Sequence, residues 1–436
     1  MRLLWSSSLF LKAAVLLYLV KPKAKQLASI EWVPLVLRVL EFGYLLQTLL
    51  AVQCSPQEAA YYLLNQLVTG FDEDKNFENA RQIVSIGGLS MLVKRMESGH
   101  VSEKSKAASI ILCCIRADGS CRHFLATNLN KGPILELLVS GNEKNSQSLA
   151  FELLTELLCI NRRTQAIRFL QGLLNGWRSL NTMHILFVYL QKARVEERPV
   201  VAAVLLQLDL LGDPLKCSVY RQEAVETITA ALDSQVYNEL VQEQSARALL
   251  MLGGRFSYTG EATTEKWLLK EAGFDENLDD SFQGKDIVVA DLMNLNEEDI
   301  EIQNWQRKAA IVLLSKRQEE IPIGTFYLHS VGDENLQSEA CSTVVPCLIE
   351  SLNRDRALEE RVLASLTLLA LIKCSGCLSE ISLADKGLMD HLRNLSQVTW
   401  TAKELISIIA SGSRHRFLEF DNLPNENQID HQNSSP

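Results

Sequence analysis

The residues that could do chemistry in this chain of 436 residues are few and scattered. Cys121 and His123 place a thiol and an imidazole two positions apart, and a cysteine nucleophile needs such a base within hydrogen-bond reach. On a helix, neighbours at this spacing point in different directions, so the pair does not predict a catalytic site. The sequence also lacks the motifs of phosphate-binding loops, zinc proteases and serine hydrolases. We therefore expect no catalytic residue, no cofactor-binding residue and no cofactor.

Metal and redox chemistry have one candidate, the C-x-x-C pair of Cys374 and Cys377. Cys341 and Cys347 could complete a four-cysteine zinc site, but the spacing differs from that of paired zinc knuckles. Cys374 continues an apolar helical pattern, and the pair lacks the βαβ setting of a redox motif. We therefore expect no metal ligands.

An acidic run gives the chain its candidate partner-binding residues. Between positions 271 and 301 the only basic residue is Lys285, and like charges at this density resist packing. The run is either a solvated, partly disordered loop or a docking segment for a basic partner. An apolar stretch at 287–295 within it predicts a short helix. The candidate partner-binding residues in this segment are Asp275, Glu276, Asp279, Asp280, Glu297, Glu298 and Asp299.

The rest of the chain repeats one pattern, imperfectly. Residues 83–118 contain a glycine turn, a short apolar helix, a polar loop and a longer helix that opens on paired alanines. Similar passes follow near 131–160 and 223–254. A period of about 40–47 residues is typical of armadillo and HEAT arrays. We therefore predict an all-α fold, an armadillo/HEAT-like right-handed α-solenoid of degenerate helical repeats. The anchor alanines of these repeats are Ala107, Ala150, Ala202, Ala246, Ala309 and Ala364.

Local signals support this reading. Ser55, Pro56 and Glu58 form a helix start, with a capping serine, a proline at the first helical position and a glutamate able to complete a capping box. Apolar residues then recur at helical spacing in each long helix, which predicts one buried face per helix. The predicted buried stripes include Ala59, Leu63 and Leu67; Leu149, Leu153, Leu157 and Ile160; Ala224, Ile228 and Leu232; Ser245, Leu249 and Leu252; and Leu358, Val362, Leu366 and Leu369.

Five segments follow from these patterns. Residues 1–54 are N-terminal helices of the array, with a start that could be truncated, and 55–254 are armadillo-like repeats. Residues 255–304 are an acidic, partly disordered insertion, and 305–416 are C-terminal armadillo-like repeats. Residues 417–436, rich in Asn, Gln, Asp and Ser, are a disordered tail.

Net charge, apolar content and cysteine positions limit the classes of partner and the compartment that we expect. The net charge of −10 lacks the basic excess of a phosphate-backbone binder, so we expect protein partners and no nucleic acid. The apolar run at 9–20 is interrupted by Lys12 and is shorter than the roughly 18 residues of a membrane span, so we expect a buried helix rather than an anchor. Cysteines at irregular positions on apolar faces predict a reducing compartment, cytoplasmic or nuclear.

Armadillo arrays that clasp extended peptides usually have an asparagine ladder on the third helix of each repeat. The equivalent positions here are Leu112 or Cys113, Thr155 and Met251. Peptide binding of the nuclear-import type is therefore not expected.

Four blocks point to one family: KPKAKQ at 21–26, EWVPLVLRVLEFG at 31–43, CSPQEAA at 54–60 and CCIRADGSCR at 113–122. They resemble the armadillo-like region of the plant E3 ubiquitin-protein ligases of the LIN/CERBERUS type, from about residue 12 to about 417. The resemblance implies a U-box that recruits the ubiquitin-conjugating enzyme and WD40 repeats, but we find neither pattern here. No residue of this chain is therefore assigned to ubiquitin transfer.

Two functions remain open. In the first, the chain is the interaction scaffold of such a ligase and presents a substrate or partner for ubiquitination. In the second, it is a stand-alone armadillo-type adaptor without a ubiquitin role. A weaker third reading is a scaffold anchored to a membrane by 9–20.

Overall fold

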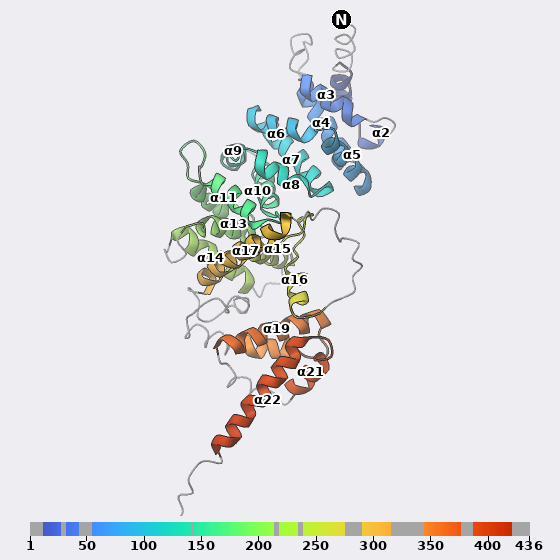
Figure 1. Ribbon diagram of the computed structural model, residues 1–436. Coiled ribbons are helices and arrows are strands. Elements are labelled where there is room, and N and C mark those ends of the chain that lie inside the picture. Colours follow the sequence, from blue (N-terminus) through green and yellow to red (C-terminus); the bar gives the residue numbers. More distant parts are fainter. Residues whose placement is uncertain are drawn as a thin grey trace, which may run out of the picture. The chain divides into compact units, whose positions relative to one another are not determined.

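The chain folds into successive antiparallel helices, seen in the computed structural model of Figure 1. The structure describes residues 12–27, 32–42, 55–140, 144–212, 218–233, 239–274, 290–314, 344–375 and 387–420. Within these ranges β structure is limited to two isolated bridges, Trp177 with Leu180 and Phe256 with Ala262. The chain divides into two compact units, residues 1–264 with 287–309, and residues 265–286 with 310–436.

The first unit contains the helices of the repeats. After a helix at 12–20, they are α2 (Ala24–Leu27), α3 (Trp32–Phe42), α4 (Pro56–Thr69), α5 (Glu73–Ser85), α6 (Gly88–Ser98), α7 (Val101–Ala117), α8 (Cys121–Asn128), α9 (Gly132–Ser140), α10 (Lys144–Leu158), α11 (Arg163–Leu173), α12 (Thr182–Lys192), α13 (Arg198–Asp209), α14 (Val219–Asp233), α15 (Glu239–Gly253) and most of α17 (Ala290–Leu314).

Three-helix repeats organise this unit. In α5–α6–α7, α8–α9–α10 and α11–α12–α13, the last helix packs against both of its predecessors. The last helices also pack on one another, in the order α4, α7, α10, α13 and α15. Because α13 lies between neighbours on several sides, its residues from Pro199 to Leu208 are all buried. A helix that is apolar all round is expected in such a central position.

The predicted helix start and stripes are visible in the structure. Ser55 Oγ accepts a hydrogen bond from the Glu58 N–H at 3.1 Å, and Pro56 opens α4. Leu153 and Leu157 of α10 are fully buried, whereas Leu149 is half-buried.

The anchor alanines follow the prediction with one exception. Ala107, Ala150, Ala202, Ala309 and Ala364 are buried, but Ala246 is exposed and Ala248 is buried in its place. Ser245 and Leu252 of the predicted stripe are buried on the same face as Ala248, so helix α15 buries the expected face and only its anchor alanine differs.

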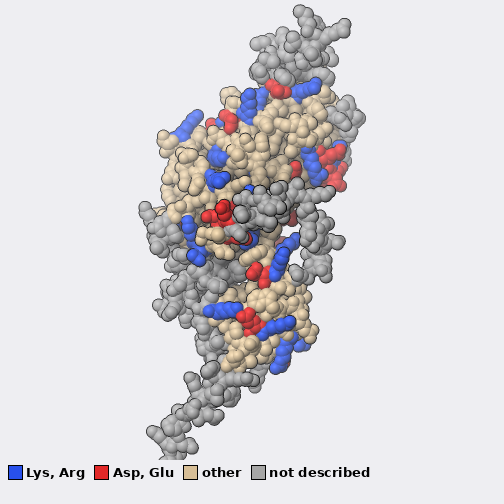
Figure 2. Space-filling view, in the orientation of Figure 1, with Lys and Arg blue, Asp and Glu red and all other residues tan. Residues whose placement is uncertain are grey.

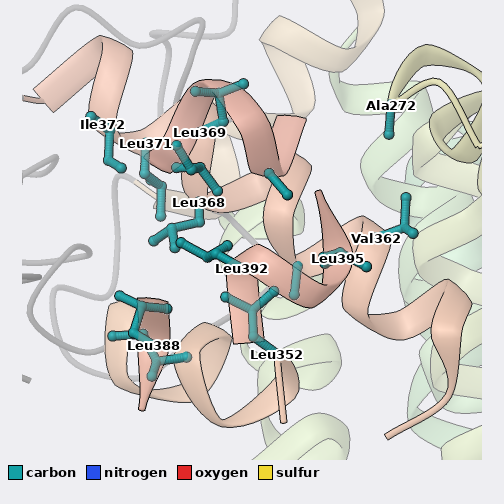
Figure 3. Close-up of a cluster of buried hydrophobic side chains, with 14 of the residues drawn as sticks. Ala272, Leu352, Val362, Leu368, Leu369, Leu371, Ile372, Leu388, Leu392 and Leu395 are labelled. Atoms are coloured by element: carbon teal, nitrogen blue, oxygen red, sulfur yellow. The ribbon is translucent and has the colours of Figure 1, made fainter. Parts of the chain in front are cut away.

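The second unit has its own core. Its helices are α16 (Thr264–Glu271), a helix at 344–351, α19 (Leu358–Ser375), α21 (Leu388–Leu395) and α22 (Trp400–Phe420). Figure 3 shows leucines of α19 and α21 meeting around Leu368 and Leu392, with Ala272 also in the cluster. The Ser365 and Thr401 hydroxyls satisfy each other inside this core at 2.6 Å.

Helix positions also bear on the predicted segment limits. The limit at 304/305 falls inside α17, and α22 continues to Phe420, beyond the limit at 416. The helix expected from 287–295 exists but is much longer, because Ile302, Trp305, Ala309 and Val312 supply a buried face after the acidic turns. None of the helices within the described ranges is long and apolar enough to cross a membrane.

Candidate functional site

The cysteine and histidine singled out in the sequence do not meet. Cys121 is buried, and its Sγ lies 3.9 Å from the carbonyl oxygen of Cys114. His123 Nε2 instead lies 2.7 Å from Asn161 Oδ1. Burial raises the pKa of the Cys121 thiol to about 11, so this thiol stays protonated at neutral pH.

The C-x-x-C pair lies largely outside the described residues. Cys341 and Cys377 are not described, and Cys374 is described only as part of the α19 backbone, whereas Cys347 is exposed. Among the side chains that the structure does describe, there is no group of three or more His, Cys, Asp or Glu residues able to hold a metal ion.

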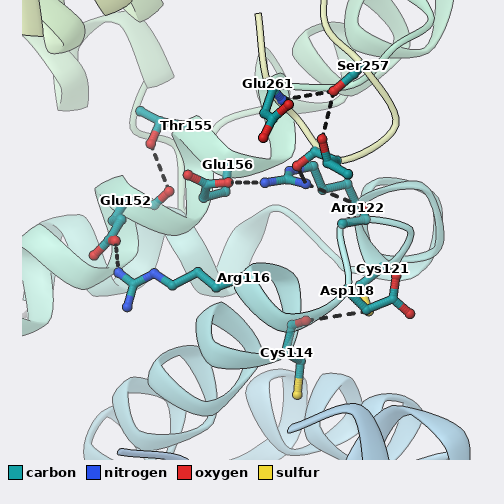
Figure 4. A network of polar contacts seen from close by, with 12 residues as sticks. Cys114, Arg116, Asp118, Cys121, Arg122, Glu152, Thr155, Glu156, Ser257 and Glu261 are labelled. Carbon is teal, nitrogen blue, oxygen red and sulfur yellow. Dashed lines mark hydrogen bonds and ion pairs between the residues drawn. The ribbon is translucent and has the colours of Figure 1, made fainter. Parts of the chain in front are cut away.

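A buried ion-pair network links three helices of the first unit, and Figure 4 shows the pair of Arg122 and Glu156 within it. Arg122 of α8 donates from Nη2 to Glu156 Oε2 at 2.6 Å, and Arg247 of α15 donates from Nη2 to Glu156 Oε1 at 2.8 Å. Burial alone would raise the pKa of the Glu156 carboxyl, but the hydrogen bonds and charges of Arg122 and Arg247 outweigh it and hold that pKa below its ordinary value. The carboxylate therefore ties an early helix to a late one.

A loop at 255–263 closes over this network. Arg122 Nη1 donates to the carbonyl oxygen of Thr259, which is 137 positions away in the chain. Gly260 has φ +87°, and a Cβ there would lie 2.4 Å from Arg122 Cζ, so both its backbone angle and the close approach require glycine. Gly119 is similarly tight, since a Cβ there would lie 2.6 Å from Thr259 Cα. We call this closure, made by Arg122 and residues 255–263, the strap.

The acidic turn of α17 lies on the start of α11. Glu298 Oε2 accepts from the Thr164 N–H at 3.2 Å, and Glu298 Oε1 also accepts from the Thr164 hydroxyl. The N-cap residue of α11, Arg162, makes no side-chain cap of its own, so a glutamate from a distant helix caps α11 instead. The Arg163 guanidinium lies 3.5 Å from the centre of the Trp305 ring, so α17 also contacts the start of α11 about two turns after Glu298.

We expect Glu298→Ala to lower the free energy of unfolding of the first unit by about 1 kcal/mol, because the Thr164 N–H loses its cap. Chemical denaturation of the full chain measures the loss, and hydrogen exchange at the Thr164 amide locates it. The control is Glu297→Ala, because Glu297 is exposed and belongs to the same turn. Equal effects of the two variants would contradict the capping role.

The candidate partner-binding residues therefore have different settings. Glu298 is half-buried on α11, and Asp299 Oδ1 pairs with Arg255 Nη2 at 3.0 Å. Glu297 is exposed. Asp275, Glu276, Asp279 and Asp280 lie outside the described residues. Contact of this set with a basic partner stays a prediction.

A tight turn between α11 and α12 has a backbone that the sequence did not suggest. Trp177 and Leu180 exchange backbone hydrogen bonds of 3.1 and 2.8 Å. The two residues between them, Arg178 and Ser179, have φ of +46° and +69°. This is the pattern of a type I′ turn, which favours Asn-Gly because side chains are strained at positive φ.

We expect Ser179→Gly to raise the free energy of unfolding by about 0.5–1 kcal/mol, because glycine removes that strain and loses some of the gain to chain entropy. Thermal and urea denaturation monitored by circular dichroism would measure it. Gly212→Ala, at a glycine for which no positive φ is recorded, is the comparison for a general glycine effect. A destabilised Ser179→Gly protein would show that the turn is not strained.

Charge is distributed in small clumps. Figure 2 shows blue and red atoms of the described residues interspersed over a larger neutral area, with no continuous field of one sign on the visible face.

Comparison with known proteins shows which family this chain is similar to. Residues 66–321 and 325–410 match the family model described as "Putative E3 ubiquitin-protein ligase LIN, ARM-like domain". Residues 1–65 match the model "E3 ubiquitin-protein ligase LIN-like, ARM repeat". The chain belongs to the LIN family. The resemblance expected from the four sequence blocks is confirmed, and so is the all-α armadillo-like fold.

Curated relatives extend the match. This LIN-family chain is 30% identical to "Putative E3 ubiquitin-protein ligase LIN-1" of Lotus japonicus over 424 residues, which cover 91% of this chain and 28% of that protein. Identity to "Putative E3 ubiquitin-protein ligase LIN" of Medicago truncatula is 29%, with the same shares covered. The chain thus spans less than a third of the length of the relatives it matches.

Sequence reasoning missed the main features of this LIN-family site. Glu156 and Arg247 are separated by 91 positions, and their pairing depends on how α10 and α15 approach each other. The sequence did contain one signal of a distinct surface, because the segment around Trp177 has basic residues and no Asp or Glu, whereas the chain as a whole is acidic.

Proposed function

We propose that this chain is the partner-holding region of a LIN-type ubiquitin ligase. The single observation that carries the proposal is that ARM-like models of that family match nearly the whole chain. Stacked helical repeats supply extended surfaces suited to protein partners. The transfer of ubiquitin then depends on a U-box module elsewhere, and this region positions the substrate. We expect protein partners rather than nucleic acid, in a reducing cytoplasmic or nuclear compartment.

The predicted acidic docking segment is part of the same proposal. Its test uses a variant with Asp275, Glu276, Asp279, Asp280 and Glu297 changed to their amides, which leaves Glu298 and Asp299 in their internal contacts. A matched control changes the exposed Glu73, Asp74 and Glu78 of α5 to their amides.

The experiment is proximity labelling in plant cells with the full chain, followed by mass spectrometry of labelled proteins and of ubiquitin remnants. We expect clients whose ubiquitination falls when the chain is removed. Loss of the same clients in the first variant and not in the α5 control would assign binding to the acidic segment. Clients with unchanged ubiquitination would favour the stand-alone adaptor.

A further inference from the structure

The segment around α11 and α12 has a positive net charge in an acidic chain. Between Glu156 and Glu196 the sequence contains no Asp or Glu, although the chain as a whole carries a net charge of −10. Within this segment Arg168 and Arg178 are exposed. The basic residues of this segment are Arg162, Arg163, Arg168, Arg178, Lys192 and Arg194.

The turn in the middle of this segment exposes apolar side chains. Leu174 and Leu180 are 45% and 39% exposed, and Trp177 between them is half-buried. The Arg178 guanidinium lies 4.7 Å from the centre of the Trp177 ring, so a cation covers the aromatic face. We call Leu174, Trp177, Arg178 and Leu180 the turn surface. Single exposed apolar residues are ordinary, but tryptophan and arginine together are the residue types that dominate binding energy at protein interfaces.

The backbone holds this surface in a strained form. The positive φ values of Arg178 and Ser179 cost free energy, and the reciprocal hydrogen bonds of Trp177 and Leu180 keep them in place. Gly132 of α9 lies beneath Trp177, where a Cβ would be 3.8 Å from the indole Cδ1. Strained backbone that the surroundings hold fixed occurs preferentially at binding sites.

The same basic segment already holds carboxylate groups of the chain itself. Glu298 caps the start of α11, at Thr164, and Glu298 and Glu301 both act electrostatically on the buried Arg163. The turn surface follows the other end of α11. It offers a cation and three apolar side chains with no acidic residue in the surrounding sequence.

We propose that the turn surface docks an acidic segment of a protein partner, with an apolar side chain seated against Trp177 and carboxylates paired with Arg178. Charge complementarity identifies this occupant, because a basic partner would gain nothing from an acid-free segment. The inference rests on the proposed function and adds the chemistry of the partner. The contact is electrostatically assisted, so binding weakens as salt increases.

A random dodecapeptide library displayed on phage, selected on the full folded chain, tests this directly. We expect selected peptides rich in Asp and Glu with one or two aromatic or leucine residues. Their synthetic copies, measured by fluorescence anisotropy, should bind Arg178→Glu at least about tenfold more weakly than the unmodified chain. Lys94→Glu makes the same change of charge at an exposed position of α6 and should alter affinity less than twofold.

Trp177→Ala is the second variant, and it should also weaken binding about tenfold or more. Thermal denaturation of each variant checks that it folds. If Trp177→Ala does not fold, Arg178→Glu still tests the inference, because Arg178 is exposed and its replacement leaves the core unchanged.

Other outcomes would overturn the inference. Selected peptides that are not acidic, or that bind Arg178→Glu as well as the unmodified chain, would place docking elsewhere and leave the partner-holding function standing. Peptides that bind only after residues 275–286 are deleted would show that the acidic segment of this chain occupies the turn surface. Failure to select any peptide would count against both the turn surface and the partner-holding function.

Discussion

Glu156→Ala is expected to destabilise the first unit by about 3–5 kcal/mol, because it leaves the buried Arg122 and the half-buried Arg247 without their shared carboxylate. The Arg122 side chain is 8% exposed, so water cannot replace the lost partner. Unfolding of the full chain in urea, followed by circular dichroism, would measure the loss.

Glu152→Ala is the matched control, one turn earlier on α10. Glu152 pairs with Arg116 at the surface, where the side chains are 36% and 54% exposed, and such exposed pairs contribute about 0–1 kcal/mol. If the two variants lost the same stability, burial of the network would not be what makes it strong.

The same network gives a pH dependence. The Glu156 pKa is held below its ordinary value in the folded protein, so the carboxylate binds fewer protons there than in the unfolded chain. This contribution to stability is complete above the ordinary glutamate pKa of about 4.3 and is lost as the pH falls through the lower folded pKa. Between pH 7 and pH 3 the unmodified chain should therefore lose more stability than Glu156→Gln. An equal loss would contradict the depressed pKa.

Leu153→Asp is expected to unfold the first unit at room temperature. Leu153 is 0% exposed in α10, which packs against α7, α9 and α13. The substitution removes an apolar side chain and places a carboxylate where no partner can reach it, a combination that costs about 5 kcal/mol or more. Native domains are stable by only about 5–15 kcal/mol, so a loss of this size removes a large part or all of the stability of the unit.

Circular dichroism and analytical size exclusion would report the unfolding of Leu153→Asp. Val188→Asp introduces the same charge on α12 at a position that is 37% exposed, and it should melt close to the unmodified chain. A normal melting curve for Leu153→Asp would remove Leu153 from the core.

Much of the fold was predictable because it depends on local signals. The Ser55 cap acts over three residues, and the stripe through Leu153 and Leu157 follows from helical spacing alone. Helix α15 shows the limit of the repeat spacing, which chose Ala246 as its anchor. Ala246 is exposed, whereas Ala248 is buried on the same face as Ser245 and Leu252 of the predicted stripe, so helical spacing was the better guide there.

Helix ends do not coincide with the segment limits that we predicted from composition. The charge density before residue 304 suggested a boundary at 304/305, but α17 carries acidic residues on its early turns and Trp305 on a buried face. One helix therefore crosses the limit. A change from acidic to apolar residues does not end a helix, because both kinds of residue can adopt helical backbone angles.

The ion-pair network and the tight turn could not be predicted from the sequence. Nothing near Glu156 in the sequence announces Arg247, and nothing in the residues at 177–180 requires two consecutive positive φ values. The Glu156–Arg247 contact depends on how distant helices pack. The turn is closed by local hydrogen bonds between Trp177 and Leu180, but Arg178 and Ser179 are not the residue types that favour positive φ, so the sequence gives no signal for it.

The strap changes how the repeats can come apart. In a simple helical array each repeat interacts only with its neighbours, so terminal repeats can fray while the middle stays folded. Arg122 and Thr259 close a loop of more than a hundred residues, which couples α8 to the segment after α15. Forming that closure is slow, since its entropy is lost before the contact is made. The first unit should therefore lose its middle repeats in one cooperative step, and a partner that grips any of these repeats would protect all of them from proteolysis.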